Sequence, residues 1–377
     1  MGSKKVVFTL NGLMFGGVAR NTINLANHMA KEGHDISILL FGRRRDLETE
    51  IDKNVKVRTI GRDYRFSFFP FLFYLLLERP DLVISAKDEV NVFVTLVHRL
   101  SFIPGRCVIT IRTTLSQQMK YSPTKRSNLT MLLAKRVYRW ADTVVAVSRG
   151  TARDAERFLN LPVNSIRTIY NPAAKPSSFL EDFPLPEHPF FQPQPVTGKR
   201  APVVLACGRY HLQKNFEGLI RSFAQVVREH DARLIILGEG GLQNDLQDLI
   251  DKLQLQEFVC LRSPVLQPEA YMQHAEVFVL NSLWEGFSNV LVEALSVGST
   301  IVSVDCPHGP SEVLEGGKYG KLVPINDPEA LSQAIIDALK KKRQVKPEEL
   351  LSRAADFTPA VIAEQYLALH SQPSKDR

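Results

Sequence analysis

Short apolar runs, each followed by a turn and a helical stretch, recur along the whole chain and constrain its fold more than any other feature. Residues 6–10 form the first run, the turn NGLMFGG follows at 11–17, a helical pattern covers 19–31, and a second run spans 36–41. Strands that alternate with helices in this way form parallel sheets covered by helices on both faces. The turns that follow the strands then share one edge of the sheet, where such folds bind ligands.

The same rhythm occurs twice, on either side of a proline-rich stretch. With 377 residues the chain is also long for a single core. We therefore predict an α/β protein with two domains, at 1–172 and 201–357, joined by a linker at 173–200. A last helix at 358–377 follows, and it can either stay with the second domain or cross back to the first. The predicted strands lie at 82–85, 107–111 and 143–148 in the first part, and at 203–207, 233–237, 258–261, 277–280 and 300–304 in the second.

Composition indicates a globular protein with an anionic partner. Apolar residues make up 44% and charged residues 23%, as in ordinary soluble domains, and the net charge of +7 favours phosphates, acidic lipid or nucleic acid as partners. The four cysteines lie among apolar neighbours without a CxxC pair, which indicates reduced thiols and a cytoplasmic location. The chain starts directly with a predicted strand rather than with an apolar leader.

The longest apolar run covers residues 66–77. It holds twelve residues and includes Pro70, so it is too short to cross a bilayer. We expect a buried or interfacial helix here.

Most of the chemistry lies in residues 281–315, NSLWEGFSNVLVEALSVGSTIVSVDCPHGPSEVLE. Seven residues separate Glu285, in a loop, from Glu293, inside a helix for which Ser288 or Asn289 is the predicted N-cap. Since a helix rises about 1.5 Å per residue, the two carboxylates lie too far apart to share one proton or one metal ion. They suit two polyhydroxylated ends of one extended ligand, and the alternative is a surface helix with two solvated glutamates.

Two turns offer backbone N–H groups to an anion. Phe287, Ser288 and Asn289 open the helix just described, where free N–H groups favour negative charge. Gly16 and Gly17 lie between a strand and a helix, where a diphosphate meets no Cβ atom. The dinucleotide fingerprint GxGxxG is not matched, and a tight turn without a ligand is the alternative for the glycine pair.

The loop CGRYHLQKNF follows the strand at 203–207 and carries two cations. Arg209 and Lys214 are expected at the carboxyl edge, where a guanidinium fork and an ammonium group suit the two phosphates of a diphosphate leaving group. A solvated loop is the alternative. Asn281 and His308 are two further candidate contacts, although His308 equally fits a loop histidine whose hydrogen bonds stay within the protein.

Three segments, GGVARNTINLANHMAKEGHDISIL, CGRYHLQKNFEGLIRSF and NSLWEGFSNVLVEALSVGSTIVSVDCPHGPSEVL, resemble retaining glycosyltransferases of family 4. The resemblance covers nearly the whole chain, with the segments in the same order, and points to enzymes of bacterial polysaccharide or lipid-linked glycan synthesis. It implies the GT-B fold, in which two Rossmann-like domains face a central cleft. It also implies a nucleotide-sugar donor, such as a UDP-sugar, with no metal and no other cofactor.

The resemblance also implies roles by position. Arg209 and Lys214 match the basic pair on the donor diphosphate, Glu285 matches the acid near the sugar hydroxyls, and Glu293 matches the acid that holds the ribose. The loops that meet the phosphates and the sugar through their backbone are matched by Gly16, Gly17, Phe287, Ser288 and Asn289.

Many members of this family present a first-domain histidine to the sugar, and the candidates here are His98 and Arg112. Arg112 follows the strand at 107–111 and reaches its carboxyl end, so we prefer it. His98 falls in a helix of mostly apolar residues, which favours a structural histidine. Glu285 is not assigned as a nucleophile for two reasons. In a retaining transfer the leaving diphosphate can itself take the acceptor proton. Two carboxylates that act as a catalytic pair must also face each other across one bond, and Glu285 and Glu293 lie too far apart for that.

The first domain carries two candidate surfaces for an anionic membrane. One is the helix at 125–140, which mixes basic residues with leucines, and the other combines Arg62 and Arg65 with the aromatic run 66–73. A core helix with a solvated face is the alternative for each. We expect a saccharide acceptor linked to lipid, an enzyme that is peripheral on the inner face of the membrane, and no nucleic-acid partner.

Two rival functions were weighed. An NADP-dependent oxidoreductase would use Arg43, Arg44 and Arg45 for the 2′-phosphate, but the missing fingerprint argues against it. A nucleotide-sugar-binding protein without transfer activity stays open, although the complete set of basic and acidic site residues argues for an enzyme.

Overall fold

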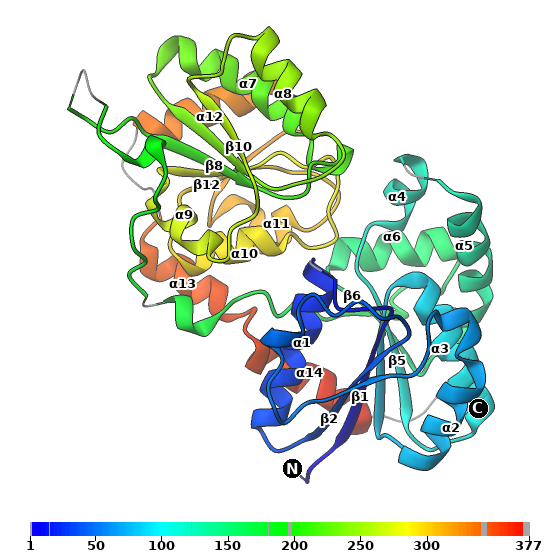
Figure 1. The fold of residues 1–377 in the computed structure, drawn as a ribbon. Helices are drawn as coiled ribbons and strands as arrows, with labels where there is room; N and C mark the ends of the chain where they lie inside the picture. The colour runs from blue at the N-terminus through cyan, green and yellow to red at the C-terminus, as the bar shows by residue number, and fades with distance from the viewer. Residues whose placement is uncertain are drawn as a thin grey trace. The chain divides into compact units, whose positions relative to one another are not determined.

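A computed structural model of the chain (Figure 1) describes residues 2–14, 16–121, 123–179, 181–194, 198–340 and 345–371. The chain divides into two compact units. Unit 1 comprises Met1–Ala173 and Pro359–Arg377, and unit 2 comprises Ala174–Thr358. Each unit holds one parallel sheet with helices packed on both faces, so the predicted α/β class with two doubly wound sheets is confirmed.

Unit 1 is built on seven parallel strands in the order β3-β2-β1-β4-β5-β6-β7. The direction of winding reverses between β1 and β4, where Phe8 pairs with Ile38 on one side and with Ile84 on the other. The elements are β1 (Lys5–Leu10), α1 (Gly17–Lys31), β2 (Asp35–Leu40), β3 (Lys56–Thr59), α2 (Phe68–Glu78), β4 (Leu82–Ala86), α3 (Asp88–Ser101), β5 (Arg106–Ile111), α4 (Leu115–Tyr121), α5 (Lys125–Val137), β6 (Thr143–Ala146), α6 (Arg149–Leu159), β7 (Ile166–Thr168) and α14 (Pro359–Ala368).

Two apolar layers hold this unit together. On one face Ile23 of α1 and Tyr366 of α14 belong to the same buried cluster, so the last helix packs against the first. On the other face Phe71, Val94 and Met131 bring α2, α3 and α5 into a second cluster (Figure 1). Residues 372–377 of the expected segment 358–377 lie outside the described residues.

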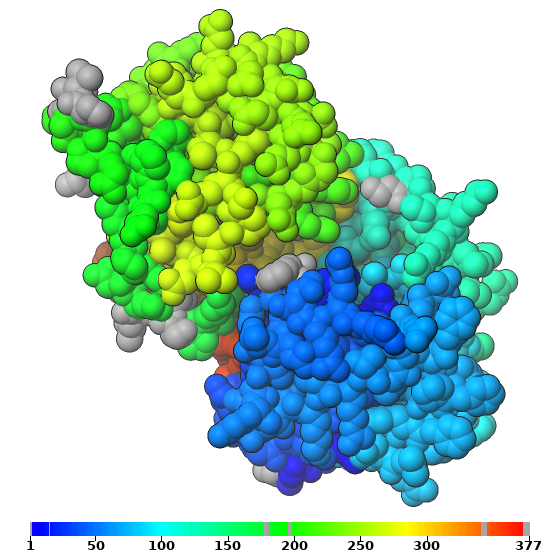
Figure 2. All heavy atoms as spheres, in the orientation of Figure 1, coloured from blue at the N-terminus to red at the C-terminus, as the bar shows by residue number. Residues whose placement is uncertain are grey.

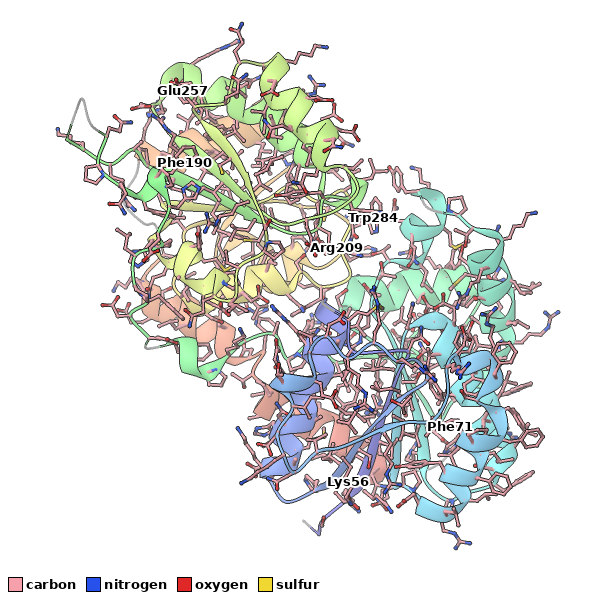
Figure 3. All side chains as sticks on the ribbon, viewed as in Figure 1. Lys56, Phe71, Phe190, Arg209, Glu257 and Trp284 are labelled. Atoms are coloured by element: carbon pink, nitrogen blue, oxygen red, sulfur yellow. The ribbon has the colours of Figure 1, made fainter. Side chains whose placement is uncertain are left out.

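The helix α2 has two apolar faces. Its inner side chains Phe71 and Leu75 are fully buried, and Figure 3 labels Phe71 on this helix. Its outer side chains Phe69, Phe73 and Leu77 are 66%, 61% and 82% exposed. The expectation of a buried helix therefore holds for the inner face, and the expectation of an interfacial helix stays a prediction for the outer face.

Unit 2 is built on six parallel strands in the order β10-β9-β8-β11-β12-β13, with the reversal between β8 and β11. Side chains of α7, α8 and α12 share one buried cluster with the strands. The elements are β8 (Val203–Cys207), α7 (Phe216–Glu229), β9 (Arg233–Leu237), α8 (Gln243–Lys252), β10 (Val259–Arg262), α9 (Pro268–His274), β11 (Val277–Leu280), α10 (Asn289–Ser296), β12 (Ile301–Val304), α11 (Pro310–Val313), β13 (Lys321–Val323), α12 (Pro328–Lys340) and α13 (Pro347–Ala355).

The proline-rich segment expected as a linker at 173–200 packs on unit 2. Phe183 and Phe191 are buried, and the Phe191 ring meets the Tyr271 ring edge-on at 5.7 Å. The prolines prevent regular secondary structure, but these two aromatic side chains anchor the segment to α9. Residues 180 and 195–197 of this segment lie outside the described residues.

Figure 2 shows the heavy atoms of the chain as spheres, in the orientation of Figure 1. In the part of the chain that the structure describes, no helix combines the length and the apolar character needed to cross a membrane.

Candidate functional site

The candidate site of unit 2 lies at the carboxyl ends of β8 and β11. These strands are neighbours in the sheet, with Val204 opposite Val277. The chain winds away from them in opposite directions, and ligands of doubly wound sheets bind at such a reversal. The loop after β8 supplies Arg209 and Lys214, and the loop after β11 supplies Glu285.

Lys214 and Glu285 form a buried ion pair at this point. The Lys214 Nζ atom lies 2.6 Å from Glu285 Oε1, and the two side chains are only 16% and 8% exposed. The Ser282 hydroxyl donates to the same carboxylate oxygen at 2.6 Å. A charged pair with so little solvent contact depends on both partners, because removing one leaves the other charge buried and unpaired.

Three hydrogen bonds tie the two loops to each other. The Asn281 side-chain amide donates to the Asn215 carbonyl at 3.0 Å, and the Leu283 N–H donates to the Gln213 carbonyl at 2.7 Å. The Gln213 amide in turn donates to the Trp284 carbonyl at 2.8 Å. Asn281, a candidate ligand contact, therefore stabilises the position of the two loops that carry Lys214 and Glu285.

A glycine allows the Lys214 side chain to lie against the end of β8. Gly208 has a φ of 156°, and a Cβ atom on it would lie 3.0 Å from Lys214 Cε. A side chain at position 208 would therefore require the Lys214 side chain to shift by a few tenths of an ångström.

The loop after β12 holds Glu285 through its backbone. The Glu285 N–H donates to the Pro307 carbonyl at 2.8 Å, and the His308 N–H donates to the Glu285 carbonyl at 2.9 Å. Gly309, at a φ of 107°, allows this contact, since a Cβ atom on it would lie 2.7 Å from the Phe287 carbonyl oxygen. His308 thus takes part in positioning Glu285 through its backbone.

Ser288 is the N-cap of α10, in agreement with one of the two predicted positions. It has a φ of 75°, however, and its side chain makes no capping hydrogen bond. Its hydroxyl is buried and has no partner among the described residues. A buried hydroxyl without a partner destabilises a protein by about 1–3 kcal/mol, and a ligand oxygen at this helix start would satisfy it. The adjoining Phe287 is buried and packs against the Phe357 ring at 5.2 Å.

Glu285 and Glu293 act on different parts of the sheet edge. Burial and, after it, the Glu293 carboxylate raise the pKa of the Cys207 thiol, which ends β8. Burial and then the Glu285 carboxylate raise the pKa of the Cys306 thiol, which follows β12. Since β11 lies between β8 and β12, those two strands lie roughly 9–10 Å apart. The pKa of each thiol thus responds to a different one of the two acids.

Arg209 lies on the surface, in the same loop as Lys214. Its side chain is exposed and has no ion pair within the described ranges, and Figure 3 labels it at the same end of unit 2 as Trp284. The His211 imidazole nearby has a lowered pKa because of burial and, second, because of the positive charge of Arg209. The site thus combines one buried and one exposed cation.

Across the described residues, no group of three or more His, Cys, Asp or Glu side chains is arranged to hold a metal ion.

In unit 1, three of the predicted residues lie at the carboxyl edge of the sheet. Gly16 is the N-cap of α1 at a φ of 149°, and Gly17 begins the helix. The Arg112 guanidinium donates to Asn171 Oδ1 at 2.9 Å and to Thr110 Oγ1 at 3.3 Å. Burial lowers the pKa of Arg112.

His98 lies elsewhere. It belongs to the last turn of α3 and is 3% exposed. Because α3 returns from the carboxyl edge toward the opposite edge of the sheet, its last turn points away from the loops that bear Gly16 and Arg112. His98 is a core residue, as the apolar helix favoured.

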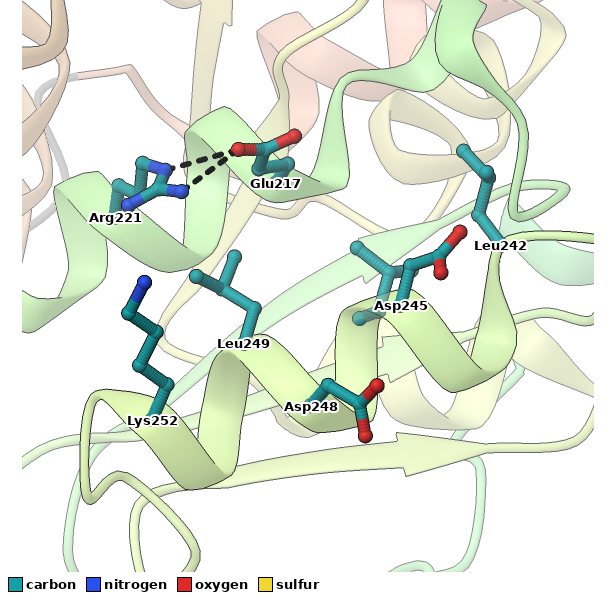
Figure 4. Close-up of a pocket in the computed structure, with 8 residues that line it drawn as sticks. Glu217, Arg221, Leu242, Asp245, Asp248, Leu249 and Lys252 are labelled. Atoms are coloured by element: carbon teal, nitrogen blue, oxygen red, sulfur yellow. Dashed lines mark hydrogen bonds and ion pairs between the residues drawn. The ribbon is translucent and has the colours of Figure 1, made fainter.

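A second surface feature of unit 2 is a shallow groove between α7 and α8 (Figure 4). Arg221 donates to Glu217 at 2.8 Å along one wall, and Asp248 and Lys252 lie along the other. The groove contains none of the predicted site residues.

Two family profiles match the chain. The family described as "Glycosyl transferases group 1" matches residues 188–356, and "Glycosyltransferase Family 4" matches residues 15–173.

Curated relatives come from bacteria and archaea. An uncharacterized glycosyltransferase of Methanocaldococcus jannaschii is 32% identical over 240 residues, which are 63% of this chain and 58% of the relative. This chain therefore spans less than two thirds of that relative's length. The N-acetylgalactosamine-N,N'-diacetylbacillosaminyl-diphospho-undecaprenol 4-alpha-N-acetylgalactosaminyltransferase of Campylobacter jejuni is 29% identical over 315 residues, covering 82% of this chain and 76% of the relative. The amylovoran biosynthesis glycosyltransferase AmsD of Erwinia amylovora is 22% identical over 96% of this chain and 98% of its own length.

Solved structures share the fold. Anabaena HepE in complex with UDP superposes with a TM-score of 0.77 at 18% identity, covering 97% of this chain and 98% of that one. The apo form of the lipopolysaccharide outer core galactosyltransferase WaaB has a TM-score of 0.69 at 18% identity, with the same coverage.

Proposed function

Because this chain belongs to the GT-B glycosyltransferases, with a Family 4 region followed by a group 1 region, we propose that it transfers a sugar from a nucleotide-sugar donor to a saccharide acceptor. We further propose that the donor is a UDP-sugar, that the anomeric configuration is retained, and that the acceptor is lipid-linked in cell-surface glycan synthesis. The observation that carries the proposal is the Lys214–Glu285 pair beside Arg209 at the strand reversal of unit 2.

The charges at this reversal suit the departure of a nucleoside diphosphate. As the bond between the sugar anomeric carbon and the diphosphate oxygen breaks, negative charge builds up on the leaving group. The Arg209 fork and the Lys214 ammonium group would stabilise that charge, and groups that are already oriented make such stabilisation effective. The N-terminus of α10 would face the same anion, and the buried Ser288 hydroxyl would donate to one of its oxygens.

The acids fit binding rather than covalent catalysis. Glu285 is held by Lys214 and Ser282, in a position to accept hydrogen bonds from sugar hydroxyls. Glu293 would hold the ribose. The acceptor hydroxyl would attack from the face that the diphosphate leaves, and its proton would pass to a diphosphate oxygen, so no protein nucleophile is needed. We propose that the reaction needs no metal ion and that Arg112 is the contact from unit 1.

The donor is supported by one structural relative. HepE, which shares the fold, was solved with UDP. A UDP-sugar supplies the ribose, diphosphate and sugar that Glu293, Lys214 and Glu285 would meet in turn.

Mass spectrometry of products from a panel of nucleotide sugars, with a lipid-linked saccharide as acceptor, tests the function. A product whose mass rises by one sugar, and whose new anomeric proton has the donor's configuration by NMR, is the expected result. Binding of UDP-sugars without any product would leave a nucleotide-sugar-binding protein as the better description.

We also propose that α2 and α5 of unit 1 contact an anionic membrane. Many of the large apolar side chains that the described surface exposes lie on these two helices and at their ends, and the cations of α5 accompany them. The exposed residues are Phe66, Phe69, Phe73, Leu76 and Leu77 around α2, and Leu129, Leu132, Leu133 and Trp140 around α5, with the cations Lys125, Arg126 and Arg136. Apolar side chains beside cations bind the interface of acidic lipid bilayers.

Liposome flotation tests this contact. The native chain should float with vesicles that contain phosphatidylglycerol and stay soluble with neutral vesicles. The triple variant Phe69→Ser, Phe73→Ser, Leu77→Ser should lose flotation, while a control with Val163→Ser and Leu266→Ser, two exposed residues elsewhere, should keep it. Equal flotation of the triple variant and the native chain would reject the contact.

A further inference from the structure

Unit 1 carries a row of cations along the carboxyl edge of its sheet. Arg43 and Arg44 follow β2, Arg62 follows β3, Lys87 follows β4, and Arg20 lies in the first turn of α1 after β1. The strands β3, β2, β1 and β4 are consecutive neighbours in the sheet. With about 4.8 Å between neighbouring strands, these loops begin within roughly 15 Å of one another.

These cations lack internal counter-ions. None of the five forms an ion pair with a described residue, and all except the half-buried Arg20 are exposed. Their neighbours are different, since Arg45 is paired with Glu48 and Arg65 with Asp63. Two acids at this edge, Asp46 and Asp88, also have no ion pair within the described ranges, so five cations face two acids and positive charge is in excess.

The loops that carry the charges are fixed by their backbones. The Leu13 N–H donates to the Arg44 carbonyl at 2.8 Å, and the Leu47 N–H donates to the Leu13 carbonyl at 3.1 Å. A Cβ atom on Gly12 would lie 3.2 Å from the Arg44 carbonyl oxygen. The arginines after β2 are therefore attached to the turn after β1, beside the strand reversal of this sheet, where ligands of such folds bind.

We infer that this edge binds anionic groups of the acceptor, either a phosphate or diphosphate or the carboxylates of acidic sugars. The inference rests on the proposed function, which gives unit 1 the acceptor. Arginine forks bind phosphate and carboxylate oxygens in pairs. Cations that lie close together repel one another, and a bound anion would remove this repulsion. An uncharged saccharide would leave these cations without a partner.

Calorimetric binding of inorganic pyrophosphate tests the inference without any transfer reaction. The background variant Arg209→Ala, Lys214→Ala removes the predicted diphosphate contacts of unit 2, so that binding reports on unit 1. The edge variant adds Arg43→Ala, Arg44→Ala and Arg62→Ala. The control variant instead adds Lys31→Ala, Arg99→Ala and Arg167→Ala, which removes the same charge from the end of α1, the end of α3 and β7.

The edge variant should bind pyrophosphate at least tenfold more weakly than the background, and the control within about twofold. Trigalacturonic acid serves as the carboxylate probe and maltotriose as the neutral one. Binding of pyrophosphate alone identifies a phosphate-bearing acceptor, and binding of trigalacturonic acid alone identifies an acidic glycan. The inference is overturned if neither anion binds the background, or if the edge and control variants weaken binding equally. Because no donor is present, loss of transferase activity cannot produce either result.

Discussion

Replacing Lys214 by alanine separates the structural from the chemical role of the buried pair. In the native protein the ammonium group lies 2.6 Å from Glu285 Oε1, in a place where the lysine side chain is 16% exposed. Removing one partner of a buried pair costs about 3–5 kcal/mol of stability. Because Ser282 still donates to the carboxylate, we expect a loss of about 2–4 kcal/mol in the free energy of unfolding.

The same substitution should remove the stabilisation of the leaving group that we propose for Lys214. Loss of one preorganised charged donor corresponds to about 2.7 kcal/mol in the transition state, so turnover should fall on the order of a hundredfold. Urea unfolding and initial rates at saturating donor measure the two effects. The exposed Lys252→Ala on α8 is the matched control and should change neither.

A double variant decides between the two roles. In Lys214→Ala, Glu285→Gln the unpaired buried charge is gone, so stability should recover by more than half, while turnover stays at least a hundredfold low. Turnover that recovers together with stability would refute a direct role of Lys214 on the leaving group, and unchanged turnover in the single variant would do the same.

Other perturbations address the rest of the structure. Glu293→Ala should weaken UDP binding about tenfold or more in calorimetry through lost ribose hydrogen bonds, with turnover at saturating donor kept within a few fold. Gly208→Ala should lower turnover tenfold or more in the same rate assay, because the new Cβ displaces the Lys214 side chain. EDTA should leave the transfer rate unchanged. Burial raises the pKa of Asp88 from 3.8 to about 6, so the folded protein holds a proton there that the unfolded chain has lost, and stability falls as the pH rises through this window. Asp88→Asn should therefore raise the free energy of urea unfolding by at most about 3 kcal/mol at pH 7, and by little at pH 3.5.

The fold could be predicted where strands are buried on both faces. The strands β8, β9 and β11 have the bounds expected from the sequence, because parallel strands covered by helices are continuous apolar runs. The short strands β3, β7 and β13 were missed. All three lie at sheet edges, and the KVRT sequence of β3 is mostly exposed and has no apolar run. The helix α13 was missed because its sequence begins with charged residues.

The sequence predicted which residues belong to the candidate site better than it predicted which of them contact one another. The sequence predicted that Arg209, Lys214 and Glu285 lie in turns that follow strands, and the structure adds that the two strands concerned, β8 and β11, are neighbours. Sequence could not show that Lys214 pairs with Glu285, because 71 positions separate them and the pairing depends on strand order. Ser282 was also missed, although it stands only three positions before the acid that it contacts, because a serine in a loop has no pattern that indicates its partner. His98 was a candidate through the family resemblance, and its burial in the last turn of α3 agrees with the structural role that its apolar helix favoured.

A crystal structure of the chain with UDP tests the central claim most directly. The diphosphate should lie beyond the ends of β8 and β11, in contact with Lys214 and Arg209, with its ribose hydroxyls on Glu293. A nucleotide bound in the groove between α7 and α8, or anywhere away from Lys214, would contradict the assignment.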